Sequence, residues 1–333
     1  MTRDPVRAIA DAVLYEGYIL WPYRRSALKN QRRFTFGGVY PPAHSREHPD
    51  DPSTMHTEVL LLAPGNARLN PTVRFLHVVR RAAARRNAEG LEEVDELTVG
   101  GERYTTWEEA IEREIALPAT PLETLAEGKH TVPVEIEAGR EVEELPGGEA
   151  ALVRSWHALA GTIEVEATRI EHDSAWRVSI HVENTTPFAG CSREEALPRT
   201  FCSAHTTLHV AEGGFISLAD PPEELSSAAA ACRNAGTWPV LVGAPGQRTT
   251  VLSSPIILED YPRVAPESPG DLFDGGEIDQ LLILNILALT DEEKAEMAAS
   301  DPRAKEILER TEALTPEQLM ALHGAIREFG MAR

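Results

Sequence analysis

Cysteine and histidine side chains gather between residues 191 and 209, where their types and spacing could hold a metal ion. Cys191, Cys202, His205 and His209 follow the pattern Cys-x10-Cys-x2-His-x3-His, which supplies the thiolate and imidazole ligands that zinc prefers. On a regular strand His205 and His209 would stand about 13 Å apart, at about 3.3 Å per residue, which is too far for one ion. Only a bulge or turn could bring them together, so we expect ordinary side chains on a sheet.

A second group of imidazoles, His44, His48 and His56, lies in and after a proline-rich segment. Imidazole is the commonest metal ligand in proteins, but these three could meet only if the segment folds back on itself. Pro49 and Pro52 favour an extended chain instead. We therefore expect no bound metal and no other cofactor. A metal carrier or metal-dependent enzyme that uses the cysteines and histidines is the alternative.

A stretch near the N-terminus mixes aromatic rings with cations, and residues 15–40 hold seven of the 19 aromatic residues. Trp, Tyr and Arg carry most of the binding energy in protein–protein interfaces. Rings beside cations can also hold single-stranded nucleic acid, and the same mixture can form a core with a solvated basic rim. We predict a partner-binding face composed of Tyr18, Trp21, Tyr23, Arg24, Arg25, Lys29, Arg32 and Arg33.

The charge of the chain is distributed unevenly. The net charge is −21, yet residues 1–90 carry 14 Lys and Arg against 8 Asp and Glu, whereas the remaining residues carry 18 against 45. A negative field repels nucleic acid and anionic lipid. We therefore expect a protein partner and no membrane association, with nucleic-acid binding through the basic stretch as a further alternative. The oligomeric state does not follow from the sequence.

Short catalytic motifs do not occur in the sequence, which has no G-x-S-x-G, H-E-x-x-H, C-x-x-C or G-x-G-x-x-G pattern. Residues 242–249 have the glycines of a phosphate loop but lack its Gly-Lys-Ser/Thr ending. Cys232 lies in an alanine-rich stretch that is typical of packing. We predict a binding protein and not an enzyme.

Three features favour a cytoplasmic location. Asp4, Asp11 and Glu16 interrupt the apolar run that a signal peptide needs. The longest apolar run, residues 281–289, is about half as long as a membrane crossing. Three cysteines, an odd number, are not typical of a disulfide framework.

The period of the apolar residues divides the chain into three parts. Val132, Val134 and Ile136 begin a series of segments with period two, which continues at 163–167 and 176–182 and indicates half-buried strands. After residue 260 capping signals precede helical patterns, at Thr290 and Asp301. We predict a multidomain α+β protein: an N-terminal α+β region (1–128), a central antiparallel immunoglobulin-like β-sandwich (129–260) and a C-terminal helical unit (261–333).

Two further segments of the N-terminal region have patterns that bear on their secondary structure. Residues 105–109 (TTWEE) resemble a capping box, which predicts a short helix through Ile115. Residues 72–86 have apolar positions that fit either a helix or a strand, so their type stays open.

Three segments resemble a known family: residues 14–36 (LYEGYILWPYRRSALKNQRRFTF), 260–279 (DYPRVAPESPGDLFDGGEID) and 289–301 (LTDEEKAEMAASD). Together they are similar to an uncharacterised family of cytoplasmic proteins encoded beside the large and small subunits of actinobacterial-type [NiFe] hydrogenases. The resemblance brings no catalytic or metal-binding residues with it. It implies an accessory role in maturing, assembling or supporting the hydrogenase, with a hydrogenase subunit or a maturation factor as the partner.

Overall fold

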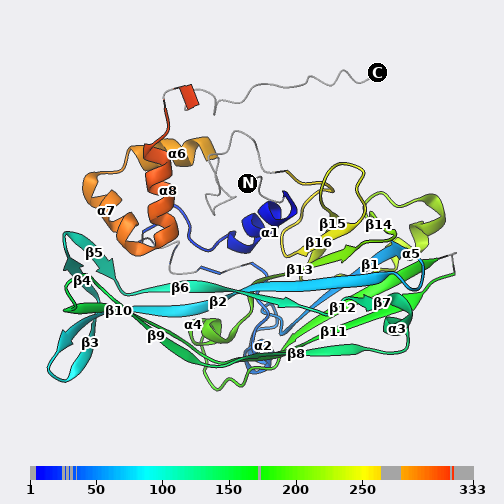
Figure 1. Ribbon diagram of the computed structural model, residues 1–333, viewed down its shortest axis with the longest axis horizontal. Coiled ribbons are helices and arrows are strands. Elements are labelled where there is room, and N and C mark those ends of the chain that lie inside the picture. Colours follow the sequence, from blue (N-terminus) through cyan, green and yellow to red (C-terminus); the bar gives the residue numbers. More distant parts are fainter. Residues whose placement is uncertain are drawn as a thin grey trace.

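The computed structural model describes residues 5–24, 27, 30, 33–34, 36–171, 174–263, 279–315 and 317–318, and within them an α+β protein dominated by antiparallel strands (Figure 1). One sheet has five strands in the order β14-β1-β12-β11-β8, and a larger sheet is built around β2. The five-stranded sheet comprises β1 (Thr54–Leu62), β8 (His130–Ile136), β11 (Leu159–Arg169), β12 (Ala175–Asn184) and β14 (Gly214–Ile216).

The larger sheet has nine strands, and β4 and β5 form a separate two-stranded sheet that packs against it. The larger sheet comprises β2 (Arg68–Asn87), β3 (Gly90–Val94), β6 (Trp107–Ala116), β7 (Thr120–Pro121), β9 (Gly139–Glu144), β10 (Ala150–Trp156), β13 (Cys202–Val210), β15 (Trp238–Leu241) and β16 (Thr250–Ser254); the two-stranded sheet comprises β4 (Glu96–Val99) and β5 (Glu102–Thr105). The 20-residue β2 runs through this sheet and pairs with β13 and β10 along one side and with β7, β6 and β3 along the other.

Strand β2 separates two hydrophobic cores. Leu69, Val73 and Phe75 belong to the core that the two sheets share, and Phe75 stacks on Phe201 with ring centroids 4.5 Å apart. Leu76 and Val78 belong instead to a second core, which they share with the N-terminal segment and the C-terminal helices. Because both faces of β2 are covered, residues 73–79 are all buried and do not alternate between buried and exposed positions. This is why the type of residues 72–86 could not be decided from periodicity.

The helices lie on one side of the larger sheet or in its connections. Figure 1 shows α1 (blue) and the group α6–α8 (orange) on the same side of this sheet, with α7 near β5. The helices are α1 (Pro5–Tyr15), α2 (Pro42–Glu47), α3 (Leu122–Ala126), α4 (Arg193–Ala196), α5 (Ser226–Ala230), α6 (Asp279–Leu287), α7 (Asp291–Ser300) and α8 (Pro302–Glu312). The capping box of α7 forms between Thr290 and Glu293, and Asp301 caps α8, as predicted.

Two sequence-based expectations differ from the structure. Residues 107–116 form strand β6 and not a helix, because Trp107 to Ala116 pair along ten positions of β2, and this pairing outweighs the local capping pattern. The expected boundary at residue 129 falls inside a shared core. Strands β1 and β2, from before residue 129, pair with β12, β10 and β13, from after it.

None of the described helices combines the length and the apolar character needed to cross a lipid bilayer.

Candidate functional site

The outer face of the five-stranded sheet carries a cluster of titratable side chains. Alternation along β12 turns Val178, Ile180 and Val182 into the core, and therefore turns Ser179 and His181 to the outer face. The register then places His56 of β1 and Glu164 of β11 on either side of His181. Ser179 has Glu58 and Glu166 as its neighbours in the next row of the sheet.

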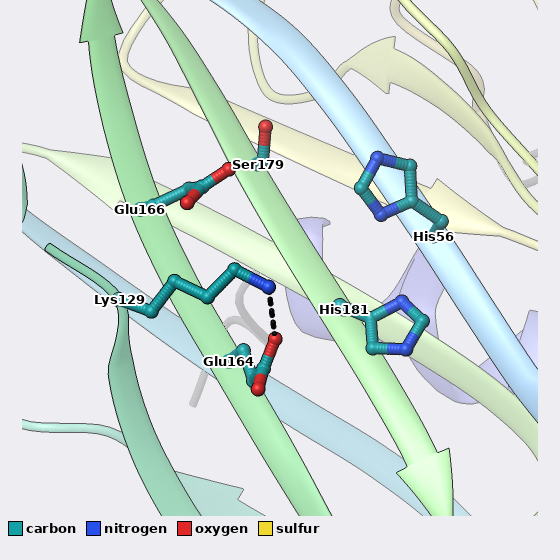
Figure 2. Close-up of a pocket in the computed structure, with 6 residues that line it drawn as sticks. All are labelled: His56, Lys129, Glu164, Glu166, Ser179 and His181. Atoms are coloured by element: carbon teal, nitrogen blue, oxygen red, sulfur yellow. Dashed lines mark hydrogen bonds and ion pairs between the residues drawn. The ribbon is translucent and has the colours of Figure 1, made fainter.

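A cavity of about 160 Å³ lies over this part of the sheet (Figure 2). Figure 2 shows the rings of His56 and His181 side by side, with Lys129 reaching across β11 to Glu164. The lining residues are His56, Lys129, Glu164, Glu166, Ser179 and His181.

Ion pairs determine how the charges of this cavity are arranged. Lys129 Nζ donates a 2.8 Å hydrogen bond to Glu164 Oε2, and this bond lowers the pKa of Glu164. Burial lowers the pKa of His181, and the neighbouring His56 lowers it further. The His181 ring is therefore neutral at neutral pH, with one nitrogen lone pair free of a proton.

The carboxylate of Glu58, two residues after His56 on β1, lies beside the His56 ring. Glu58 Oε1 lies 3.5 Å from His56 Nε2. Glu58 is itself anchored, since Oε2 accepts a 2.7 Å hydrogen bond from the backbone N–H of Arg233 and Oε1 accepts one from Ser179 Oγ at 3.4 Å. Because Ser179 donates to a carboxylate and not to an imidazole, the cavity does not pair a hydroxyl nucleophile with a histidine base. Its chemistry is that of two imidazole rings beside carboxylates.

A second cavity, of about 270 Å³, is mostly apolar and opens where β8 passes the start of β2. We call it the β8 slot. It is lined by Leu69, Pro71, Leu117, Pro118, Thr120, Leu125, His130, Thr131, Val132 and Val165.

Three residues of the predicted partner-binding face are internal. Tyr18, Tyr23 and Arg33 are buried, with 3%, 0% and 4% of their surface exposed. This is a correction to the exposed face that we expected, and its cause is that the helices α6–α8 pack against the aromatic segment. The Arg33 guanidinium lies 3.9 Å from the centre of the Trp107 ring and donates to the carbonyl of Glu108 at 2.7 Å.

The other members of that face divide into two groups. Trp21 is half-buried, and Arg24 forms ion pairs with Glu293 at 3.0 Å and Glu296 at 3.8 Å. Contact of Trp21 and Arg24 with a partner stays a prediction. Arg25, Lys29 and Arg32 lie outside the described residues.

The four cysteines and histidines considered as zinc ligands from the sequence have separate environments. Cys191 is exposed, whereas Cys202 is buried, and burial raises the pKa of its thiol to about 12. A bulge separates Cys202 from His205, which is also buried, while His209 is exposed and bonds to Thr250.

The second expected group of histidines is also divided. His44 is buried, stacks on Tyr40 and His48, and lies 2.8 Å from Asp51 Oδ2, whereas His56 lies on β1 opposite His181. Among the described residues, no three His, Cys, Asp or Glu side chains are arranged to hold a metal ion.

Sequence reasoning missed His181, Glu164 and Glu166, although it located both strands. The signal was present, because the polar residues between the apolar positions of 163–167 and 176–182 must face outward together. Their pairing with His56 depends on the register of strands that are about 100 residues apart in the chain. No family model matches the chain, and none of the curated proteins matches it either.

Proposed function

We propose that this protein is a non-catalytic accessory or assembly factor that binds an extended segment of a partner protein along β8. The observation that carries the proposal is the position of β8 at the end of the five-stranded sheet, directly beside the β8 slot. Among the described strands, β8 pairs with β11 alone. Its other edge therefore presents backbone C=O groups, and N–H groups at every position except Pro133, to an added strand.

The β8 slot would supply specificity to such a docked strand. A cavity of about 150 Å³ can hold a benzene ring, so a slot of 270 Å³ has room for a large aliphatic or aromatic side chain. A partner strand would place alternate side chains toward the slot and toward solvent. Glu135 of β8 is exposed, and the chain is strongly acidic, which favours a partner segment with Lys or Arg beside the apolar anchor.

The partner class follows from the sequence resemblance described above, which points to a hydrogenase subunit or a hydrogenase maturation factor. We also propose that the two sheets form an immunoglobulin-like sandwich. The apolar core shared by both sheets supports it, since sandwiches commonly bind partners at their edges and ends.

Co-purification from cells that express the tagged full chain with untagged hydrogenase subunits tests this proposal. Pro118→Arg changes an exposed residue of the slot, and Val132→Arg places a charge inside it. We expect each variant to capture at least about tenfold less hydrogenase subunit, because about 1.4 kcal/mol of binding energy corresponds to a factor of ten.

Val142→Arg is the matched control, because Val142 is an exposed valine of β9 in the other sheet and does not line the slot. Thermal unfolding of each purified variant verifies that it is folded. If wild-type protein captures no hydrogenase subunit or maturation factor, the proposed partner is wrong. If the folded Pro118→Arg variant captures as much as wild type, the proposed surface is wrong.

A further inference from the structure

The His56–His181 pair is a cross-strand pair of imidazoles on an open sheet face. The two residues are directly opposite each other on antiparallel strands, a position that places Cβ atoms about 4.5–5.5 Å apart. Their ring centroids are 5.8 Å apart and the ring planes are inclined by 54°. Both side chains line the same cavity, as Figure 2 shows.

This spacing fits coordination of one ion by both rings. A metal–nitrogen bond of about 2.0–2.1 Å places the ion about 3.2 Å from the centre of an imidazole ring, so two rings on one ion stand at most about 6.4 Å apart. The observed 5.8 Å lies within this limit. Small rotations of the two side chains would narrow the nitrogen–metal–nitrogen angle toward the value of a tetrahedral or square-planar site.

We propose that His56 and His181 form a two-histidine site for a late first-row divalent ion, such as Ni²⁺, Cu²⁺ or Zn²⁺. Imidazole is a preferred ligand of these ions, whereas Mg²⁺ and Ca²⁺ require oxygen ligands. Glu164 is paired with His181 across the strands, but its carboxylate is hydrogen-bonded to Lys129. The remaining ligand positions of the ion would therefore be filled by water. The site takes His56 from the histidine group considered from the sequence and pairs it with His181 instead of His44 and His48.

The surroundings of the pair have the features of a built ligand site. Glu58 lies behind the His56 ring at Nε2 and is anchored by Arg233 and Ser179, so it orients that ring and leaves Nδ1 for the ion. Glu164 and Glu166 add negative charge around the cavity.

Isothermal titration of the full chain, without an affinity tag and in metal-free buffer, tests the site with NiCl₂, ZnCl₂ and MgCl₂ as separate probes. We expect one Ni²⁺ or Zn²⁺ per chain and no binding of Mg²⁺. His56→Asn and His181→Asn should each weaken Ni²⁺ binding by more than about tenfold, since even residues behind a ligand contribute about 10–100-fold. His209→Asn, an exposed histidine of β13, should leave the affinity unchanged.

The Lys129→Met variant tests whether the affinity for Ni²⁺ can be increased. It releases Glu164 to act as a third ligand, so it should tighten Ni²⁺ binding, and adding Glu164→Gln should reverse that gain. Paramagnetic broadening of the His56 and His181 imidazole signals by Ni²⁺ locates the ion in the unmodified protein. Absence of stoichiometric binding by wild type, or full affinity in a folded His181→Asn variant, overturns the proposal.

Discussion

The phenol of Tyr18 donates a 2.6 Å hydrogen bond to Asp301 Oδ2 inside the protein, joining two residues that are 283 positions apart. Asp301 Oδ1 also accepts the N–H of Arg303 and so caps α8. One carboxylate therefore both begins a helix and attaches the N-terminal segment to it. Burial raises the pKa of Asp301, which makes its hydrogen bonds essential to the ionised form.

Removing the Tyr18 hydroxyl should destabilise the fold. Tyr18→Phe leaves a buried carboxylate without one donor, and we expect the free energy of unfolding to fall by about 1.5–3 kcal/mol in urea titrations. Tyr104→Phe is the control, because the Tyr104 hydroxyl bonds to Glu102 at an exposed site and should cost only a few tenths of a kcal/mol. Equal effects of the two variants would contradict this role of Tyr18.

Two adjacent arginines of β2 should differ sharply in their contribution to stability. Arg81 is buried and donates to Glu109 Oε1 at 2.7 Å and to the carbonyls of Ser300, Thr105 and Ala299 at 2.9, 3.0 and 3.2 Å. Arg81→Met removes these four buried hydrogen bonds and should cost about 3–5 kcal/mol in urea unfolding. Arg80→Met removes only an exposed ion pair with Glu93 and should cost less than about 1 kcal/mol. A small loss from Arg81→Met would show that β2 and α7 are held together by other contacts.

Gly161 should not tolerate a methyl group. A Cβ at this position would lie 2.4 Å from the carbonyl oxygen of Glu183 and 2.8 Å from the Phe201 ring. Gly161→Ala must therefore displace β11 from β12, and we expect a loss of about 1–3 kcal/mol in thermal or urea unfolding. Gly128→Ala, where no atom lies within 4 Å of the added Cβ, is the control and should be nearly neutral. A neutral Gly161→Ala variant would show that this strand pair can separate freely.

Acid should destabilise the protein before its carboxylates titrate. Burial lowers the pKa of His77 to about 4 and that of His205 to about 3, against about 6.5 in the unfolded chain. Their contribution to stability is complete above pH 6.5 and is lost as the pH falls toward 4 and then 3, because only the unfolded chain takes up the protons.

We expect each of these two histidines to account for about 2 kcal/mol of the stability lost between pH 7 and pH 4.5, measured by urea unfolding across that range. His205→Gln should flatten the profile, whereas His209→Gln, at an exposed site, should not. A profile unchanged by His205→Gln would mean that this ring is protonated equally in the folded and unfolded chain.

Much of the secondary structure could be predicted because it depends on neighbours in the chain. The alternation around Ile163 and Val178 predicted β11 and β12, and the capping residues Thr290 and Asp301 predicted the starts of α7 and α8. The helix predicted from the capping pattern at 105–109 was wrong, because the structure of that segment depends on a strand that is distant in the chain. A local signal worth about 1 kcal/mol lost to ten pairings with β2.

The sequence by itself determined strands β11 and β12, the starts of α7 and α8, and where the acidic and basic residues lie along the chain. The tertiary structure alone decided that Tyr18 and Arg33 are internal, that β2 faces two cores, and that His56 meets His181. The physical reason is the separation along the chain over which each kind of interaction acts. Periodicity and capping act over a few residues, whereas burial and strand register depend on partners about 100 to 280 residues away along the chain.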